Sequence, residues 1–141
     1  MLKKTIKYTD YNGVDRTEDF YFNLTKAEIM EMELGTEGGM AEMLQRIVAA
    51  NDRVTLVKVF KDLVLKAYGE KSADGKRFMK SEEIATAFSQ TEAYSQIFME
   101  LATDTDKAAD FVNGIMPSDV KKSPDELKKM ELELMAKAQA N

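Results

Sequence analysis

Two segments near the N-terminus have the composition of paired β-strands, and the turn between them restricts the possible folds more than any other feature. Residues 2–9 and 14–22 are rich in β-branched and aromatic side chains, and they flank the turn signal DYNG at residues 10–13. The second arm alternates apolar and polar positions, and its apolar positions are Phe20, Phe22 and Leu24. An isolated hairpin is marginally stable in water, so we expect helices from the rest of the chain to cover this apolar face.

Downstream of the hairpin, apolar residues recur at three-and-four spacing, which predicts a series of short amphipathic helices. The first is expected over residues 26–34, because Thr25 and Glu28 form a capping box and Gly35 is a typical left-handed cap. The other helices are expected over residues 40–50, 54–68, 81–88 and 92–102, and from Asp104 to Val112, with Asn113-Gly114 as the last cap.

Together these elements predict a mainly α fold with an N-terminal β-hairpin, an α+β class, arranged as a small multi-helix bundle over residues 1–117. Residues 70–77 carry the turn pair Asp74-Gly75 among charged side chains, so we expect an exposed loop there. The predicted core consists of Phe20, Phe22, Leu44, Ile47, Phe60, Leu63, Phe88, Phe98 and Leu101.

The last segment, residues 118–141, is expected to be a linker followed by a C-terminal helical arm. The sequence SPDE at residues 123–126 combines an N-cap, proline at the first helical position and a capping glutamate, which predicts a helix over residues 124–140. One narrow apolar seam runs along this helix, and we interpret it as the candidate partner-binding site: Leu127, Met130, Leu134 and Met135. The seam fits one partner helix, from either the chain's own domain or another protein.

The residue types that are missing exclude several kinds of chemistry. The chain has no cysteine and no histidine, so disulfides, the usual zinc sites, thiol nucleophiles and imidazole catalysis are excluded. Asp104, Asp106 and Asp110 resemble the start of a calcium loop, but Ala109 occupies the position that requires glycine. We therefore expect no catalytic residue, no metal and no other cofactor. The apolar runs are far shorter than the roughly 20 residues that span a bilayer, so we expect a cytoplasmic protein without membrane association.

Charge and methionine content indicate contacts with proteins. The 25 acidic residues outnumber the 20 basic ones, and a net charge of -5 disfavours nucleic-acid binding. The basic segment at residues 71–80 still leaves a nucleic-acid-binding regulator as an alternative. Ten methionines suit either a loosely specified core or an adaptable binding surface. The unpaired edge of the predicted hairpin, together with the methionines, predicts a homo-oligomer.

Several phrases of the sequence resemble one protein family. They are KAYG at residues 66–69, FSQTEAY at 88–94 and FVNGIMP at 111–117, and the opening hairpin followed by FNLTKAEI at 22–29 fits as well. Over about residues 1–117 the chain is thereby similar to the tail assembly chaperones of siphophages and prophages of Gram-positive bacteria.

This resemblance implies a non-enzymatic protein that binds the tape measure protein, and possibly tail tube subunits, during tail morphogenesis. Such a protein acts in the host bacterial cytoplasm and is not expected in the finished virion. The main alternative is a structural virion component, such as a head-to-tail connector or a tail terminator.

Overall fold

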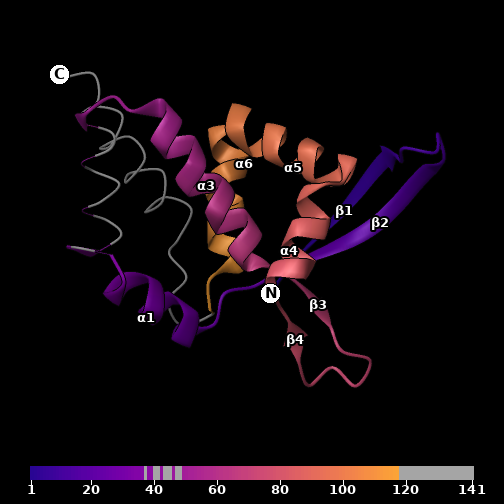
Figure 1. Ribbon diagram of the computed structural model, residues 1–141, viewed down its shortest axis with the longest axis horizontal. Coiled ribbons are helices and arrows are strands. Elements are labelled where there is room, and N and C mark those ends of the chain that lie inside the picture. Colours follow the sequence, from indigo (N-terminus) through magenta and orange to yellow (C-terminus); the bar gives the residue numbers. More distant parts are fainter. Residues whose placement is uncertain (37, 40–41, 43–45, 47–48, 118–141) are drawn as a thin grey trace.

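A small antiparallel sheet and five helices make up the described part of the chain. The computed structural model describes residues 1–36, 38–39, 42, 46 and 49–117 (Figure 1). The strands are β1 (Leu2–Thr9), β2 (Asp15–Phe22), β3 (Tyr68–Lys71) and β4 (Phe78–Met79), in the sheet order β1-β2-β3-β4. The helices are α1 (Lys26–Leu34), α3 (Arg53–Ala67), α4 (Glu82–Ser89), α5 (Glu92–Thr103) and α6 (Thr105–Ile115).

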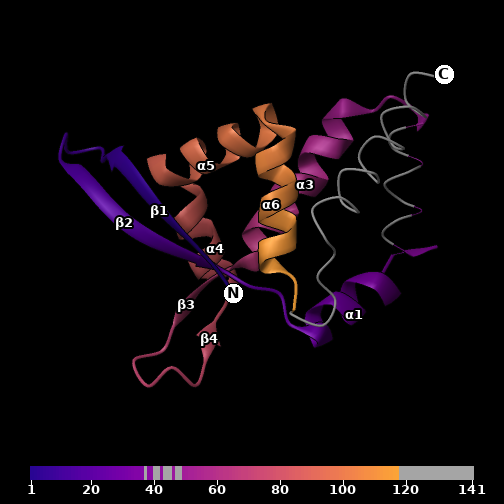
Figure 2. The same ribbon diagram turned by 180° about the vertical axis from the view of Figure 1, so that it is seen from behind.

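The predicted α+β fold with an N-terminal hairpin is confirmed in these residues. β1 and β2 pair antiparallel along their whole length, from Leu2 opposite Phe22 to Thr9 opposite Asp15. The helices gather on one side of this hairpin, and the same arrangement is visible from behind in Figure 2. The predicted helix over residues 40–50 falls mainly on residues outside the description, and the C-terminal arm, residues 118–141, falls entirely outside it.

A second hairpin, β3 and β4, corrects the prediction that residues 70–77 are only a loop. Tyr68 pairs with Phe22 instead of continuing the helix. α3 therefore ends at Ala67, and Gly69 lies in a strand. Gly69 is therefore not a helix cap, although it directly follows the segment 54–68 that was predicted to be helical. Its missing side chain leaves room for β4, because a Cβ there would lie 2.7 Å from the Phe78 ring and 2.9 Å from the Met79 carbonyl oxygen. The turn itself is at Gly75, whose φ is +74°.

Most helix starts agree with the sequence, whereas the predicted glycine caps at the helix ends do not. The Thr25–Glu28 capping box is present, and the side chains of Ser81, Thr91 and Asp104 accept bonds from the first amides of α4, α5 and α6. Gly35 ends α1 with a right-handed φ of -78°, so the left-handed cap was wrongly predicted.

The end of α6 was also wrongly predicted, because the helix continues through Asn113-Gly114 to Ile115. A Cβ at Gly114 would lie 3.0 Å from a methyl carbon of Leu2. Glycine at this position therefore serves the close approach of α6 to β1.

The core forms where the end of β2 meets the ends of two helices. Phe22 and Leu24 are fully buried, and the backbone N–H groups that follow the strand donate to helix-end carbonyls: Asn23 to Ala67 at 2.8 Å and Leu24 to Ile115 at 2.9 Å. The Phe22 ring lies 5.7, 5.8 and 5.2 Å from three other rings, those of Tyr68, Phe88 and Phe111. Such contacts between tilted rings stabilise a core beyond the area that they bury.

Some members of the predicted core are buried, whereas others are only partly buried. Phe22, Phe88 and Leu101 are buried as expected. The other predicted members are only partly buried where they are described, and they are Phe20, Phe60, Leu63 and Phe98. Leu44 and Ile47 lie outside the described residues. The predicted core list did not include the buried residues Ile6, Leu24, Val64, Ala67, Ala93, Ile97, Phe111 and Ile115, although Leu24 was placed on the apolar face of the hairpin.

The different burial of two phenylalanines gives a test of this core. Phe22→Ala should lower the free energy of unfolding by about 3–5 kcal/mol, because the ring is fully buried. Phe60→Ala should cost about 1–2 kcal/mol, because that ring is only partly buried. Urea denaturation of both variants measures the difference, and equal losses would contradict the assigned burial.

Candidate protein-binding surfaces

The β1–β2 hairpin extends beyond the helices and exposes one whole face. Odd-numbered residues of both strands point away from the helices, and the exposed ones include Lys3, Thr5, Lys7, Asp15 and Asp19. Two pairs on this face are joined by side-chain bonds, from Thr5 to Asp19 at 2.6 Å and from Thr9 to Asp15 at 2.9 Å. The outer face is therefore a polar ladder of threonines, lysines and aspartates.

The opposite face of the hairpin is anchored on α5 near its base. Ile6 is buried, and the Lys4 ammonium lies 3.3 Å from the carboxylate of Glu100 on α5. Glu100 also pairs with Lys107 of α6 at 3.2 Å. Burial alone would raise the pKa of Glu100, but the bonds from the two lysines outweigh it and lower that pKa.

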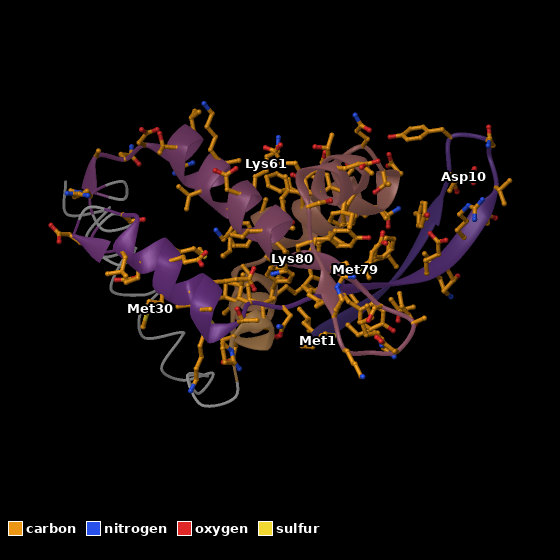
Figure 3. All side chains as sticks on the ribbon, turned by 60° about the horizontal axis from the view of Figure 1, so that its bottom comes forward. Met1, Asp10, Met30, Lys61, Met79 and Lys80 are labelled. Atoms are coloured by element: carbon orange, nitrogen blue, oxygen red, sulfur yellow. The ribbon has the colours of Figure 1, made fainter. Side chains whose placement is uncertain are left out.

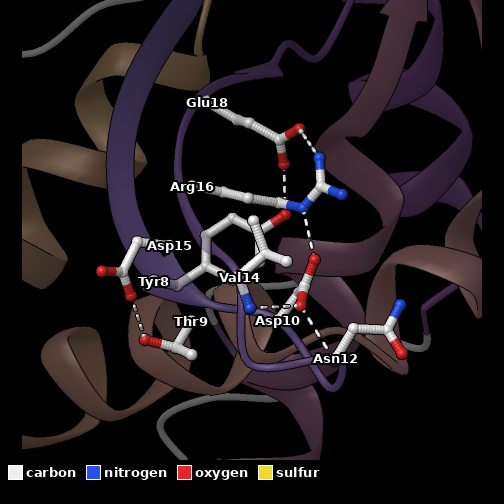
Figure 4. Close-up of polar contacts among 8 residues, drawn as sticks. All are labelled: Tyr8, Thr9, Asp10, Asn12, Val14, Asp15, Arg16 and Glu18. Atoms are coloured by element: carbon white, nitrogen blue, oxygen red, sulfur yellow. Dashed lines mark hydrogen bonds and ion pairs between the residues drawn. The ribbon is translucent and has the colours of Figure 1, made fainter.

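The tip of the hairpin is held rigidly by one aspartate (Figure 4). The Asp10 carboxylate accepts bonds from the amides of Asn12 and Val14, each at 2.9 Å, and from the Arg16 guanidinium at 2.6 Å. The bond from Arg16, followed by that from Val14, lowers the pKa of Asp10. This turn holds Tyr11 in solvent with 79% of its surface exposed. Tyrosine is enriched among the residues that dominate protein–protein binding, so Tyr11 is a candidate contact residue.

A second bond stiffens the hairpin behind the tip. The Tyr8 hydroxyl donates to the Glu18 carboxylate on the neighbouring strand, which raises the pKa of Tyr8. Glu18 also lies 3.8 Å from the Arg16 guanidinium. The distal half of the hairpin is thus cross-linked by polar side chains, although the helices do not cover it.

Helix α1 presents an apolar surface at the other end of the molecule. No residue of this helix is buried, and Met30 and Leu34, one turn apart, are 64% and 82% exposed. Figure 3 shows Met30 and the hairpin tip, marked by Asp10, on opposite sides of the molecule. Ile29 and Met32 pack against the core from the other side of the helix.

One lysine fastens α1 to the rest of the fold. The Lys80 ammonium lies 2.6 Å from the Glu28 carboxylate and 2.6 Å from the backbone carbonyl of Asn23. Burial works to raise the pKa of Glu28, but the bonds from Lys80 and from Thr25 prevail and lower it. This bond connects α1 to the chain just after β4, 52 residues away in sequence.

Two of the four basic side chains at residues 71–80 are engaged within the chain, those of Lys71 and Lys80. The Lys71 ammonium lies 4.2 Å from the centre of the Tyr21 ring, and Lys80 is bound as described above. Asp74 accepts bonds from the Ser72 hydroxyl and the Lys76 amide, so Gly75-Lys76 belongs to a tight turn. These contacts give no support to a phosphate or nucleic-acid site.

Asp104 has a structural role in this fold. Its carboxylate accepts bonds from the amides of Asp106 and Lys107 at the start of α6. Within the described ranges, no group of three or more acidic side chains is placed to hold a metal ion. No helix of the described part is long and apolar enough to cross a membrane.

The structure leaves the predicted site untested and adds surfaces that the sequence prediction missed. Leu127, Met130, Leu134 and Met135 lie outside the described residues. The missed residues are Tyr11 at the tip and Met30 and Leu34 on α1. The i, i+4 spacing of the last two on an otherwise acidic helix was a signal that they share one exposed face.

Comparison with known protein families identifies a relationship. A family model described as "Phage tail assembly chaperone" matches residues 1–141, the whole chain. No curated protein and no solved structure matched.

The Glu28–Lys80 bond predicts a pH-dependent contribution to stability. Glu28→Gln removes the charge while glutamine still completes the capping box, so the expected loss near neutral pH is about 1 kcal/mol. Because the folded-state pKa of Glu28 is lowered, the stabilisation is present above the unfolded-state pKa and disappears as the pH falls through the folded-state pKa. Urea denaturation across this pH range should show wild type and variant converging in acid.

The matched control is Glu31→Gln, an exposed position on the same helix. This control should leave stability nearly unchanged at every pH. A Glu28→Gln loss that persists undiminished in acid would contradict the role given to the ion pair.

Proposed function

The chain belongs to the phage tail assembly chaperone family, and from this premise we propose that it binds the tape measure protein during tail morphogenesis. The match along residues 1–141 is the observation that carries the proposal. A family of assembly chaperones indicates a non-enzymatic role. Tail tube subunits, which assemble around the tape measure protein, are a second candidate partner.

The exposed apolar surface of α1 supports a function in protein binding. Met30 and Leu34 form an adaptable contact of the kind that receives the apolar face of a partner helix. A long helical client has many such faces. Binding them in turn would keep the client soluble before the tail tube encloses it.

The proposed client contact extends to the C-terminal arm. The Leu24 amide donates to the Ile115 carbonyl, so the chain leaves α6 beside the start of α1. Residues 118–141 follow in sequence from this point of the fold. We assign the arm's seam, Leu127, Met130, Leu134 and Met135, to the same client.

The proposed site of action is the host bacterial cytoplasm during tail assembly, in siphophages or prophages of Gram-positive bacteria. A chaperone is released before the particle is complete, so it should be missing from finished virions. A head-to-tail connector or tail terminator would remain in the particle. Protein analysis of purified virions therefore distinguishes these two functions.

Truncation after Lys122 tests the role of the arm. We propose that residues 1–117 form the folded domain, so the shortened chain should keep its cooperative unfolding transition. Its capture of the co-expressed tape measure protein should fall by about tenfold or more, because the apolar seam is removed. Co-purification from cells that express both proteins measures this loss.

Two full-length variants separate the seam from the rest of the arm. Replacing Leu127, Met130 and Leu134 together with serine should reproduce the loss of client binding. The control replaces Lys128 and Lys129 with alanine on the charged face and should bind the client like wild type. If neither truncation nor the seam variant reduces capture, the arm is not the client contact.

A further inference from the structure

The β1–β2 hairpin has two backbone edges without a partner strand among the described residues. β1 is the first strand of the sheet, so its outer edge is unpaired. β2 pairs with β3 only at Tyr21–Gly69 and Phe22–Tyr68, which leaves the edge from Asp15 to Phe20 unpaired. Figure 1 shows β3 and β4 turning away from this part of β2. Unpaired edges of this length are templates for strand addition.

The alternation of hydrogen bonds across the hairpin shows which backbone groups point outward. The Asp10 amide donates to the Val14 carbonyl, which makes this a hydrogen-bonded pair. Such pairs recur at every second residue, so even-numbered residues bond across the hairpin and odd-numbered ones point outward. On the β3 side, the amide of the odd-numbered Asn23 likewise points outward and donates to the Ala67 carbonyl. Residues 3, 5 and 7 of β1 and residues 15, 17 and 19 of β2 thus offer free amides and carbonyls.

The two edges carry opposite charges on the exposed face. Lys3 and Lys7 lie on the β1 edge, and Asp15 and Asp19 lie on the β2 edge, with all four side chains exposed. Pairing of β1 with β1 of another copy would place lysines among lysines, and pairing of β2 with β2 would gather aspartates. Like charges placed opposite each other destabilise a sheet, whereas opposite charges stabilise it.

We propose that β1 of one copy pairs antiparallel with the free edge of β2 of a second copy. One register makes the charges of the outer face of the joined sheet complementary. On the outer face Lys3 lies opposite Asp19, Thr5 opposite Thr17 and Lys7 opposite Asp15. On the inner face Leu2 lies opposite Phe20, Lys4 opposite Glu18 and Ile6 opposite Arg16.

This register differs from the one inside the hairpin by two residues. Within the chain, Lys3 lies opposite Tyr21 and Lys7 opposite Thr17, so neither lysine faces an acid directly across the hairpin. The charges of the two edges are therefore complementary between two copies and not within one hairpin. Because the contact joins two different edges, every added copy leaves one edge of each type free, and the assembly can lengthen. The proposal does not depend on the identity of the client.

Charge reversal tests the contact in the full chain. One variant carries Lys3→Glu and Lys7→Glu, and the other carries Asp15→Lys and Asp19→Lys. Each alone should weaken self-association by about tenfold or more, because like charges then face each other. An equimolar mixture should restore association, since each edge again meets an edge of opposite charge. The control reverses two exposed lysines of α3, Lys58→Glu and Lys61→Glu, and should associate like wild type.

Sedimentation velocity across a roughly hundredfold concentration range measures these equilibria. Wild type should form species larger than a dimer, and added salt should weaken them because it screens the ion pairs. A monomeric wild type, unaffected single variants or a mixture without recovery would each overturn the proposal. Association that requires Met30 and Leu34 but not the edge charges would assign the contact to α1 and would overturn it as well.

Discussion

The three residues from Phe22 to Leu24 hold the described fold together. Phe22 and Leu24 are buried, and the amides of Asn23 and Leu24 bond to the last carbonyls of α3 and α6. Helix ends leave such carbonyls without partners, and buried polar groups that stay unpaired are costly. The strand therefore satisfies two helix ends with its backbone while its side chains fill the space between them.

This arrangement also decides which parts of the molecule stay uncovered. β3 pairs only with the last two residues of β2, so among the described residues no strand pairs with the remainder of the hairpin at either edge. α1 begins directly after Leu24 and is fixed by the Glu28–Lys80 bond, while Met30 and Leu34 stay exposed. The hairpin and the exposed face of α1 are separate surfaces, so the proposed client contact and the proposed contact between copies do not overlap.

Predictions from the sequence agree with the structure where they depend on residues that are close together in the chain. The hairpin, its turn at Asp10, the cap at Thr25 and the helix starts near Ser81, Thr91 and Asp104 depend on neighbours within a few residues, and each was predicted. The second hairpin was missed because helical spacing continues to Tyr68, whereas pairing with Phe22 ends the helix one residue earlier. The exposed fraction of Phe60, which is only partly buried, likewise depends on how far neighbouring elements extend over its ring.

The sequence by itself determined the strand and helix segments, the absence of cysteine and histidine chemistry, and the opposite charges of the two hairpin strands. These properties follow from residue type and short spacing. Only the tertiary structure decided that Gly69 and Gly114 serve close approaches, that Lys80 fastens α1, and that part of the β2 edge stays unpaired. Each of these depends on contacts between residues far apart in the chain, and local patterns do not encode such distances.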